Sequence, residues 1–225
     1  MKLNKLVYEV LTIAREMSDD SNITELLVED LINEYRSKYI QIEYSKRNVV
    51  SQISVQSFNL GMTVVDSSND PSVNIGTAVL ESDKLPELIN LAKKPGIIRI
   101  RSIDGIKGEI AFMNIDRAKN TSFSRFKTIN AFLDNNNKLY VIGNKPSTIL
   151  IENITVDAVL ETPNDITNYP YKDRAVGDEL GSYPIPSSMW SFVKQEVLKD
   201  IFMSYKVPND NVNNEIDDKE LNTNA

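Results

Sequence analysis

The sequence contains no cysteine and no histidine among its 225 residues. Disulfide frameworks, zinc sites with thiolate or imidazole ligands, cysteine nucleophiles and Ser-His-Asp triads each require one of these residue types, so all are excluded. Carboxylates remain as acid-base pairs, Asp19-Asp20 and Asp178-Glu179 among them, but none sits in a motif that has a mechanism. We therefore predict that the protein is not an enzyme and that it uses no metal or cofactor.

The chain also lacks phosphate-binding motifs and long apolar runs. It contains neither GxGxxG nor a Walker phosphate loop, and its nearest glycine cluster, residues 104–108, lies in a predicted hairpin. No apolar run approaches the roughly 18 residues that cross a bilayer, and the N-terminus lacks the apolar core of a signal peptide. These absences predict synthesis in the cytoplasm and no membrane partner.

Acidic residues outnumber basic ones by 32 to 25, which gives a net charge of -7. The negative electrostatic field of such a protein repels nucleic acid and anionic membranes unless the basic residues are segregated on one face. The densest basic run, which is interleaved with Phe123 and Phe126, consists of Arg117, Lys119, Arg125 and Lys127. It predicts either a loop that faces phosphates or a solvated or intersubunit loop.

Apolar residues at helical spacing predict two helices near the N-terminus. The first, from Lys2 to Met17, carries a stripe of six residues: Leu3, Leu6, Val7, Val10, Leu11 and Ala14. After a polar break, Thr24 is a candidate N-cap of a second helix. That helix repeats apolar residues at a spacing of four: Leu27, Leu31, Tyr35 and Tyr39. The pair predicts a helical hairpin over residues 1–45, either as a cover for the strands or as an arm that docks on a neighbouring subunit.

Alternating apolar residues and turn residues predict an antiparallel β meander between Pro95 and Glu161. Strands at 97–101 and 109–115 flank Asp104-Gly105, a pair that favours a tight hairpin turn. Strands at 129–133 and 138–142 flank four further turn-forming residues. The β-branched run 149–160 predicts one bent strand or two.

Upstream of the meander the strand pattern is less regular. Residues 49–65 predict two strands divided at 59–61, and residues 73–80 predict another short strand. Residues 82–89 fit either a capped helical turn or an extended segment. The β-rich region therefore covers residues 49–161.

Beyond Glu161 the sequence predicts a long loop, a last helix and a tail. Residues 162–186 are polar and rich in tyrosine and proline, whereas 187–205 carry a helical stripe that includes Trp190 and Val193. We predict that these two residues anchor the last helix on the N-terminal helical pair. Residues 206–225 are polar and acidic, which predicts a flexible tail. The predicted fold is α+β, with one domain over residues 1–205.

Four features together carry a family resemblance: the N-terminal helical hairpin, the run from Leu85-Pro86 to Ile103-Asp104-Gly105, the strand at 138–141 leading to 154–163, and Tyr183-Pro184-Ile185-Pro186 before the last helix. In this order they resemble ring proteins of the head-to-tail connector of crAss-like podophages. More distantly, the layout is similar to the tail adaptor proteins of T7-like phages. The resemblance covers most of the chain from Lys2 to Tyr205.

The resemblance implies a virion structural protein at the portal-tail junction, synthesised in the cytoplasm of the bacterial host. It implies a ring of twelve copies that contacts the portal protein and other ring or tail proteins. The ring would form the channel for DNA packaging, retention and ejection, without sequence-specific contact to DNA. A second interpretation stays open, a non-catalytic β-rich module that binds carbohydrate or a protein partner, because exposed tyrosines between Tyr169 and Tyr183 could stack on sugars.

Overall fold

The computed structural model describes residues 2–17, 23–65, 77–92, 94–103, 108–114, 117, 129–144, 148–169 and 182–204. The chain divides into a helical unit, residues 1–39 with 185–225, and a β-rich unit, residues 40–184. Helices and strands are both present, which confirms the predicted α+β class. The single domain predicted for residues 1–205 stays a prediction, and the predicted acidic tail lies outside the described residues.

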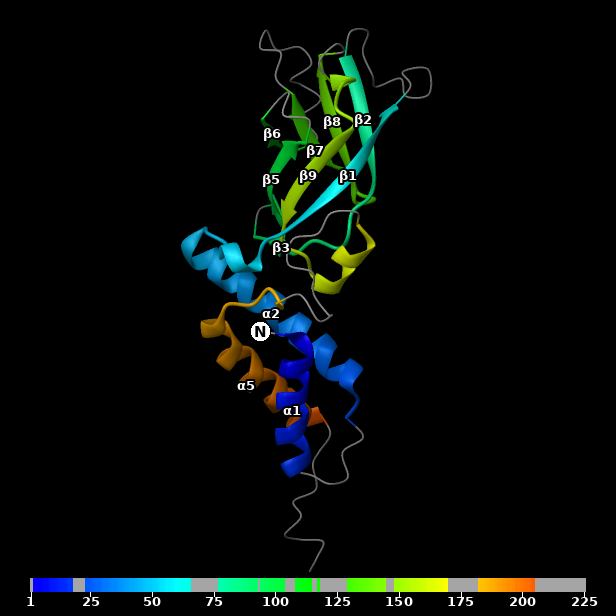
Figure 1. Ribbon diagram of the computed structural model, residues 1–225. Helices are drawn as coiled ribbons and strands as arrows, with labels where there is room; N and C mark the ends of the chain where they lie inside the picture. The colour runs from blue at the N-terminus through cyan, green and yellow to red at the C-terminus, as the bar shows by residue number, and fades with distance from the viewer. Residues whose placement is uncertain are drawn as a thin grey trace, which may run out of the picture. The chain divides into compact units, whose positions relative to one another are not determined.

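The helical unit is built from α1 (Leu3–Met17), the first part of α2 (Glu25–Arg47) and α5 (Ser187–Ser204) (Figure 1). All six residues of the predicted stripe on α1 are buried, and each large aliphatic side chain among them contributes roughly 1.5–3 kcal/mol by its burial. The predicted bounds of α1 agree with the structure to within one residue. Local periodicity therefore places this helix correctly.

The N-cap of α2 is as predicted, but its buried face is displaced by one residue. The Oγ1 of Thr24 accepts a hydrogen bond from the N–H of Leu27 at 3.3 Å. The predicted stripe, Leu27, Leu31, Tyr35 and Tyr39, is only half-buried. The most buried stripe follows one position later and includes a charged residue: Val28, Ile32, Arg36 and Ile40. Because arginine is rarely buried completely, the sequence pattern favoured the neighbouring, wholly apolar stripe.

Seven strands of the β-rich unit close into a barrel in the order β1-β2-β8-β7-β6-β5-β9 (Figure 1). Their bounds are β1 Gln56–Val65, β2 Thr77–Lys84, β5 Ile97–Ser102, β6 Glu109–Phe112, β7 Asn130–Leu133, β8 Lys138–Asn144 and β9 Asn153–Ala158. A small ribbon of β3 (Asn90–Leu91) and β4 (Lys94–Pro95) and two 3₁₀ helices, η1 (Gln52–Ser54) and η2 (Pro163–Asn168), complete the unit. Closure pairs strands that would otherwise present open edges.

The barrel keeps the predicted hairpins but not the simple order of a meander. Strands β5 and β6 pair antiparallel, as do β7 and β8. Strands β6 and β7 instead run parallel, with Ala111 opposite Asn130. Strand β9 pairs with both β1 and β5, not with β8. Alternation along a strand decides which side chains face the core, but it does not identify the neighbouring strand.

The predicted break in the first strand is wrong, because β1 runs without interruption through Gly61. Gly61 pairs with Asn153 of β9, and a Cβ atom at Gly61 would meet nothing within 4 Å. The segment after β2 is extended, not helical, with Leu88 forming a bridge to Leu160. Within the predicted long loop, residues 163–168 form η2, in which Ile166 is buried.

Apolar side chains from all seven strands fill the barrel interior: Phe58, Leu60, Leu80, Ile97, Ile100, Ile110, Ala131, Leu139, Val141, Ile154, Val156 and Ala158. Barrels of this size have room for packed side chains and not for a wide pore. Beside this core the backbone approaches itself closely at Gly96, where a Cβ atom would lie 2.8 Å from the carbonyl oxygen of Val159 and 2.9 Å from that of Ile89. Only glycine fits at this point without a shift of the backbone.

Candidate functional site: surfaces for assembly

Of the predicted basic loop, the structure describes only Arg117, whose side chain is exposed. Lys119, Arg125 and Lys127 lie outside the described residues, as do Phe123 and Phe126. The role of these residues as an intersubunit or DNA-facing loop therefore stays a prediction.

Trp190 and Val193 of α5 lie inside the helical unit, with exposed fractions of 7% and 1%. The indole Nε1 of Trp190 donates to Oε2 of Glu9 on α1 at 3.2 Å, and Nζ of Lys194 lies 2.6 Å from Oε1 of the same carboxylate. The hydrogen bond from Lys194 lowers the pKa of Glu9, burial opposes this shift, and Trp190 adds to it. One carboxylate of α1 thus holds two side chains of α5.

A second polar link joins α5 to α2. The hydroxyl of Tyr35 donates to Oδ2 of Asp200 at 2.8 Å, and this hydrogen bond raises the pKa of Tyr35 to about 12. The rings of Tyr39 and Phe192 stack with their centroids 5.7 Å apart, although Phe192 stays 53% exposed. The half-buried stripe of α2 therefore contacts α5 and leaves part of an aromatic pair open to solvent.

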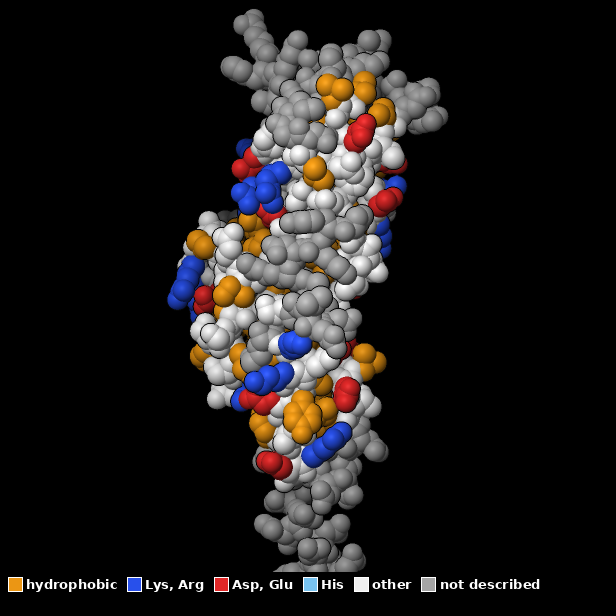
Figure 2. Space-filling model, in the orientation of Figure 1, with side chains coloured by type: hydrophobic (Ala, Val, Ile, Leu, Met, Phe, Trp, Pro, Cys, Tyr) orange, Lys and Arg blue, Asp and Glu red, His pale blue; other side chains and the backbone are white. Residues whose placement is uncertain are grey.

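Several large apolar side chains of the helical unit are exposed. Tyr8, Leu26 and Met203 have exposed fractions of 70%, 69% and 66%. Figure 2 shows hydrophobic side chains between acidic and basic ones over this unit. A groove of about 340 Å³ has six lining residues from α1 and α2: Asn4, Val7, Tyr8, Leu11, Glu25 and Glu29. Single exposed apolar side chains are common on soluble proteins, whereas large contiguous apolar patches mark surfaces that contact other proteins.

The barrel wall carries a charged cluster of two arginines around one carboxylate. Nε of Arg99 lies 2.9 Å from Oδ2 of Asp157, and Nη2 of Arg101 lies 2.9 Å from Oδ1. The hydroxyl of Ser57 donates to Oδ1 at 2.6 Å. Burial opposes ionisation of Asp157, but the hydrogen bonds from Ser57, Arg99 and Arg101 outweigh it and lower the pKa of this carboxyl. In Figure 2 a group of basic side chains lies over β5 with acidic ones beside it.

The strand predicted at 97–101 contains Arg99 and Arg101, but the sequence does not indicate their shared acceptor. The two arginines lie at i and i+2 of β5, so a strand places them on one face. Asp157 is 58 residues away from Arg99 and becomes its neighbour only through the pairing of β5 with β9. No local signal identifies such a partner.

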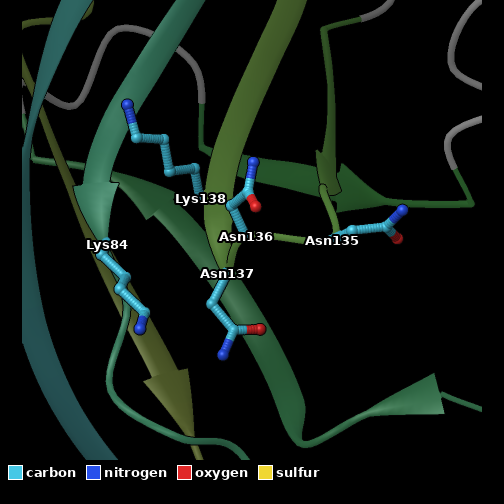
Figure 3. A pocket seen from close by; sticks show the side chains of 5 residues that line it. All are labelled: Lys84, Asn135, Asn136, Asn137 and Lys138. Atoms are coloured by element: carbon cyan, nitrogen blue, oxygen red, sulfur yellow. The ribbon is translucent and has the colours of Figure 1, made fainter.

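A shallow hollow of about 440 Å³ lies at the turn between β7 and β8 (Figure 3). Its lining residues are Lys84, Asn135, Asn136, Asn137 and Lys138. The side chains of Lys84 and Lys138 extend in opposite directions, and Nζ of Lys138 lies 3.7 Å from a carboxylate oxygen of Glu81. The two ammonium groups therefore do not converge on one position, so the hollow is not arranged to bind an anion.

The tyrosines that motivated a carbohydrate-binding interpretation are engaged inside the protein where the structure describes them. Tyr183 is 1% exposed. The ring of Tyr169 packs against Phe58 with centroids 4.9 Å apart, and its hydroxyl donates to the carbonyl oxygen of Lys84 at 2.9 Å. Tyr183 therefore offers no open ring face, whereas the ring of Tyr169 is half-buried and in contact with Phe58.

Across the residues that the structure describes, no group of three or more acidic side chains is arranged to hold a metal ion. Among the described helices, none is long and apolar enough to cross a membrane.

The described residues combine a filled barrel with a helical unit, and comparison with known families gives the class of protein. The family model described as phage tail ring protein 2 matches residues 5–219, and the chain belongs to this family. The chain is also similar to ring protein 2 of Bacteroides phage crAss001, with 23% identity over 229 residues that cover 97% of this chain and 98% of the relative. The predicted resemblance to ring proteins of crAss-like phages is confirmed, and with it the assignment as a structural protein of the virion.

Proposed function

We propose that the chain forms an oligomeric ring in the portal-tail connector of a phage particle. Twelve copies surround the channel through which DNA is packaged, retained and ejected. The ring contacts the portal protein on one side and other ring or tail proteins on the other. Membership of the tail ring protein family supports the ring itself, whereas the place in the connector and the copy number are parts of the proposal.

The filled barrel is the observation that carries the channel proposal. Phe58, Ile100 and Val156 each have an exposed fraction of 0% and occupy the interior together with the rest of the core. Because native cores are packed about as densely as organic crystals, DNA has no path through a single copy. A DNA channel must then be enclosed by several copies placed around it.

The charge of the chain supports passage of DNA without tight binding. Affinity for the phosphate backbone depends on lysine and arginine, which release counterions when they contact phosphates. With a net charge of -7, the chain repels DNA at long range. Contacts between copies and to neighbouring proteins fall to the exposed apolar side chains, such as Tyr8 and Leu26 of the helical unit.

Quantitative mass spectrometry of purified virions tests the proposal. Isotope-labelled reference peptides of this chain and of the portal protein give both copy numbers, and the major capsid protein serves as the abundant control. We expect a ratio near one between this chain and a twelve-copy portal. A chain that is absent from virions, or present at a ratio far from one, would contradict the proposed ring.

A further inference from the structure

The charged cluster on the barrel holds two guanidinium groups in place while leaving them accessible. The side chain of Asp157 is 5% exposed, whereas those of Arg99 and Arg101 are each 43% exposed. A buried acceptor thus orients two half-exposed donors. Side chains that are already ordered lose less entropy when a ligand binds to them.

Most of the donor capacity of the two arginines is unused. A guanidinium group has five N–H donors in a planar fork. Within the described part of the chain, Arg99 donates only through Nε and Arg101 only through Nη2. Two guanidinium groups around one carboxylate also leave one net positive charge. This geometry suits a carboxylate or a phosphate that binds in a bidentate manner.

The surroundings favour a carboxylate on a protein over the phosphates of DNA. Ile98 and Ile103, near the two ends of β5, are 39% and 44% exposed. Arginine beside aliphatic side chains is typical of protein interfaces, whereas DNA backbone binding uses several cations in a row.

We propose that Arg99 and Arg101 bind an acidic side chain of a neighbouring copy of this chain. The copy is the favoured partner because a ring places copies of this chain side by side, and the 32 acidic residues of each copy supply carboxylates for the arginine pair. The inference rests on the proposed function, since it requires copies that stand side by side. It adds the chemical nature of one contact between them.

Zero-length cross-linking in virions tests the contact. The variant Arg99→Lys places an amine where the guanidinium lies, and a water-soluble carbodiimide joins amines only to carboxylates in direct contact. The variant is supplied from a plasmid during infection by the parent phage, so mixed particles form even where the variant alone assembles poorly. Asp157 retains Arg101 and Ser57 as partners, which preserves the fold of the barrel.

We expect cross-linked dimers of this chain on a denaturing gel, and peptide mapping should join residue 99 to an Asp or Glu of a second copy. The control is Arg47→Lys, whose side chain is 74% exposed and has its own acidic neighbour, Glu43. It should give only links within one chain. Links from residue 99 solely to Asp157, or to a different protein, would overturn the inference. Absence of the chain from virions would first refute the proposed function and, with it, this contact.

A second measurement separates the carboxylate from phosphate. In virions from cells that express only Arg99→Gln, incorporation of the chain should fall at least about tenfold, as expected when one partner of an interfacial charge pair is removed. Purified parent and Arg99→Gln protein should bind a short fluorescent DNA duplex equally weakly at physiological salt. Normal incorporation of the variant, or DNA binding that depends on Arg99, would show that the pair has another partner.

Discussion

Truncation of Trp190 to alanine should destabilise the helical unit strongly. The side chain is 7% exposed and is hydrogen-bonded to Glu9. Removal of a buried tryptophan side chain typically costs about 3–5 kcal/mol, out of the roughly 5–15 kcal/mol that stabilises a protein domain. For a chain of this length the loss corresponds to a fall in melting temperature of about 6–20 °C.

Phe192→Ala is the matched control for this experiment. Phe192 is also an aromatic residue of α5, but it is 53% exposed and stacks on Tyr39. Loss of such a stacking contact costs about 0.5–1.5 kcal/mol. The melting temperature of this variant should fall by no more than about 6 °C. The difference between the two variants gives the combined contribution of the buried indole and its hydrogen bond to Glu9.

Circular dichroism at 222 nm measures both variants, and the fluorescence of the parent adds a local probe because Trp190 is the only tryptophan. Trp190→Phe separates the two contributions of the indole, since it keeps most of the volume and removes the bond to Glu9, at a cost of about 1 kcal/mol. The reasoning is refuted if Trp190→Ala melts like the parent. A Trp190→Ala protein that folds normally but is missing from virions would make Trp190 an interface residue.

Four further variants test the barrel and the link between α2 and α5. Gly96→Ala should lower the free energy of unfolding, measured with urea, by about 1–3 kcal/mol, because the added Cβ meets backbone oxygens. The control Gly61→Ala places its Cβ in open space and should change this free energy by less than about 0.5 kcal/mol. Equal effects of the two substitutions would contradict the close approach at Gly96. Ionised Asp157 stabilises the fold because its folded pKa lies below the unfolded value of about 3.9. The stability that Asp157→Asn removes should be present above about pH 4 and disappear as the pH falls through the lower folded pKa; a deficit in urea unfolding that is the same at pH 7 and pH 3 would argue against this. Tyr35→Phe should lower the free energy of unfolding by about 0.5–1.5 kcal/mol at pH 7 and remove one tyrosine from the absorbance titration near pH 12. In the parent protein, this contribution to stability is lost as the pH rises from about 10, the unfolded pKa of tyrosine, through 12, the folded pKa. An absorbance titration that is the same in the variant and the parent would refute the assignment.

Local pattern was sufficient for much of the secondary structure. The stripe on α1 and the hairpin of β7 and β8 follow from spacing and turn residues within one segment. The absence of cysteine and histidine excludes whole classes of chemistry by composition alone. The order of parts also led to the correct protein family. Each of these inferences uses residues that are close in the chain, or a property of the whole composition.

Tertiary structure decided how the segments meet. Closure of the barrel places Ser57 opposite Asp157, 100 residues away, through the pairing of β1 with β9. The pairing of β5 with the other side of β9 brings Arg99 and Arg101 to the same carboxylate. The buried face of α2 includes Arg36, which a hydropathy pattern assigns to solvent. Strand partners, register and the environment of a charged side chain depend on contacts across the whole chain, and alternation along a single strand is compatible with many of them. The helical and strand segments are therefore a property of local sequence, whereas the charged cluster exists only because distant strands pair.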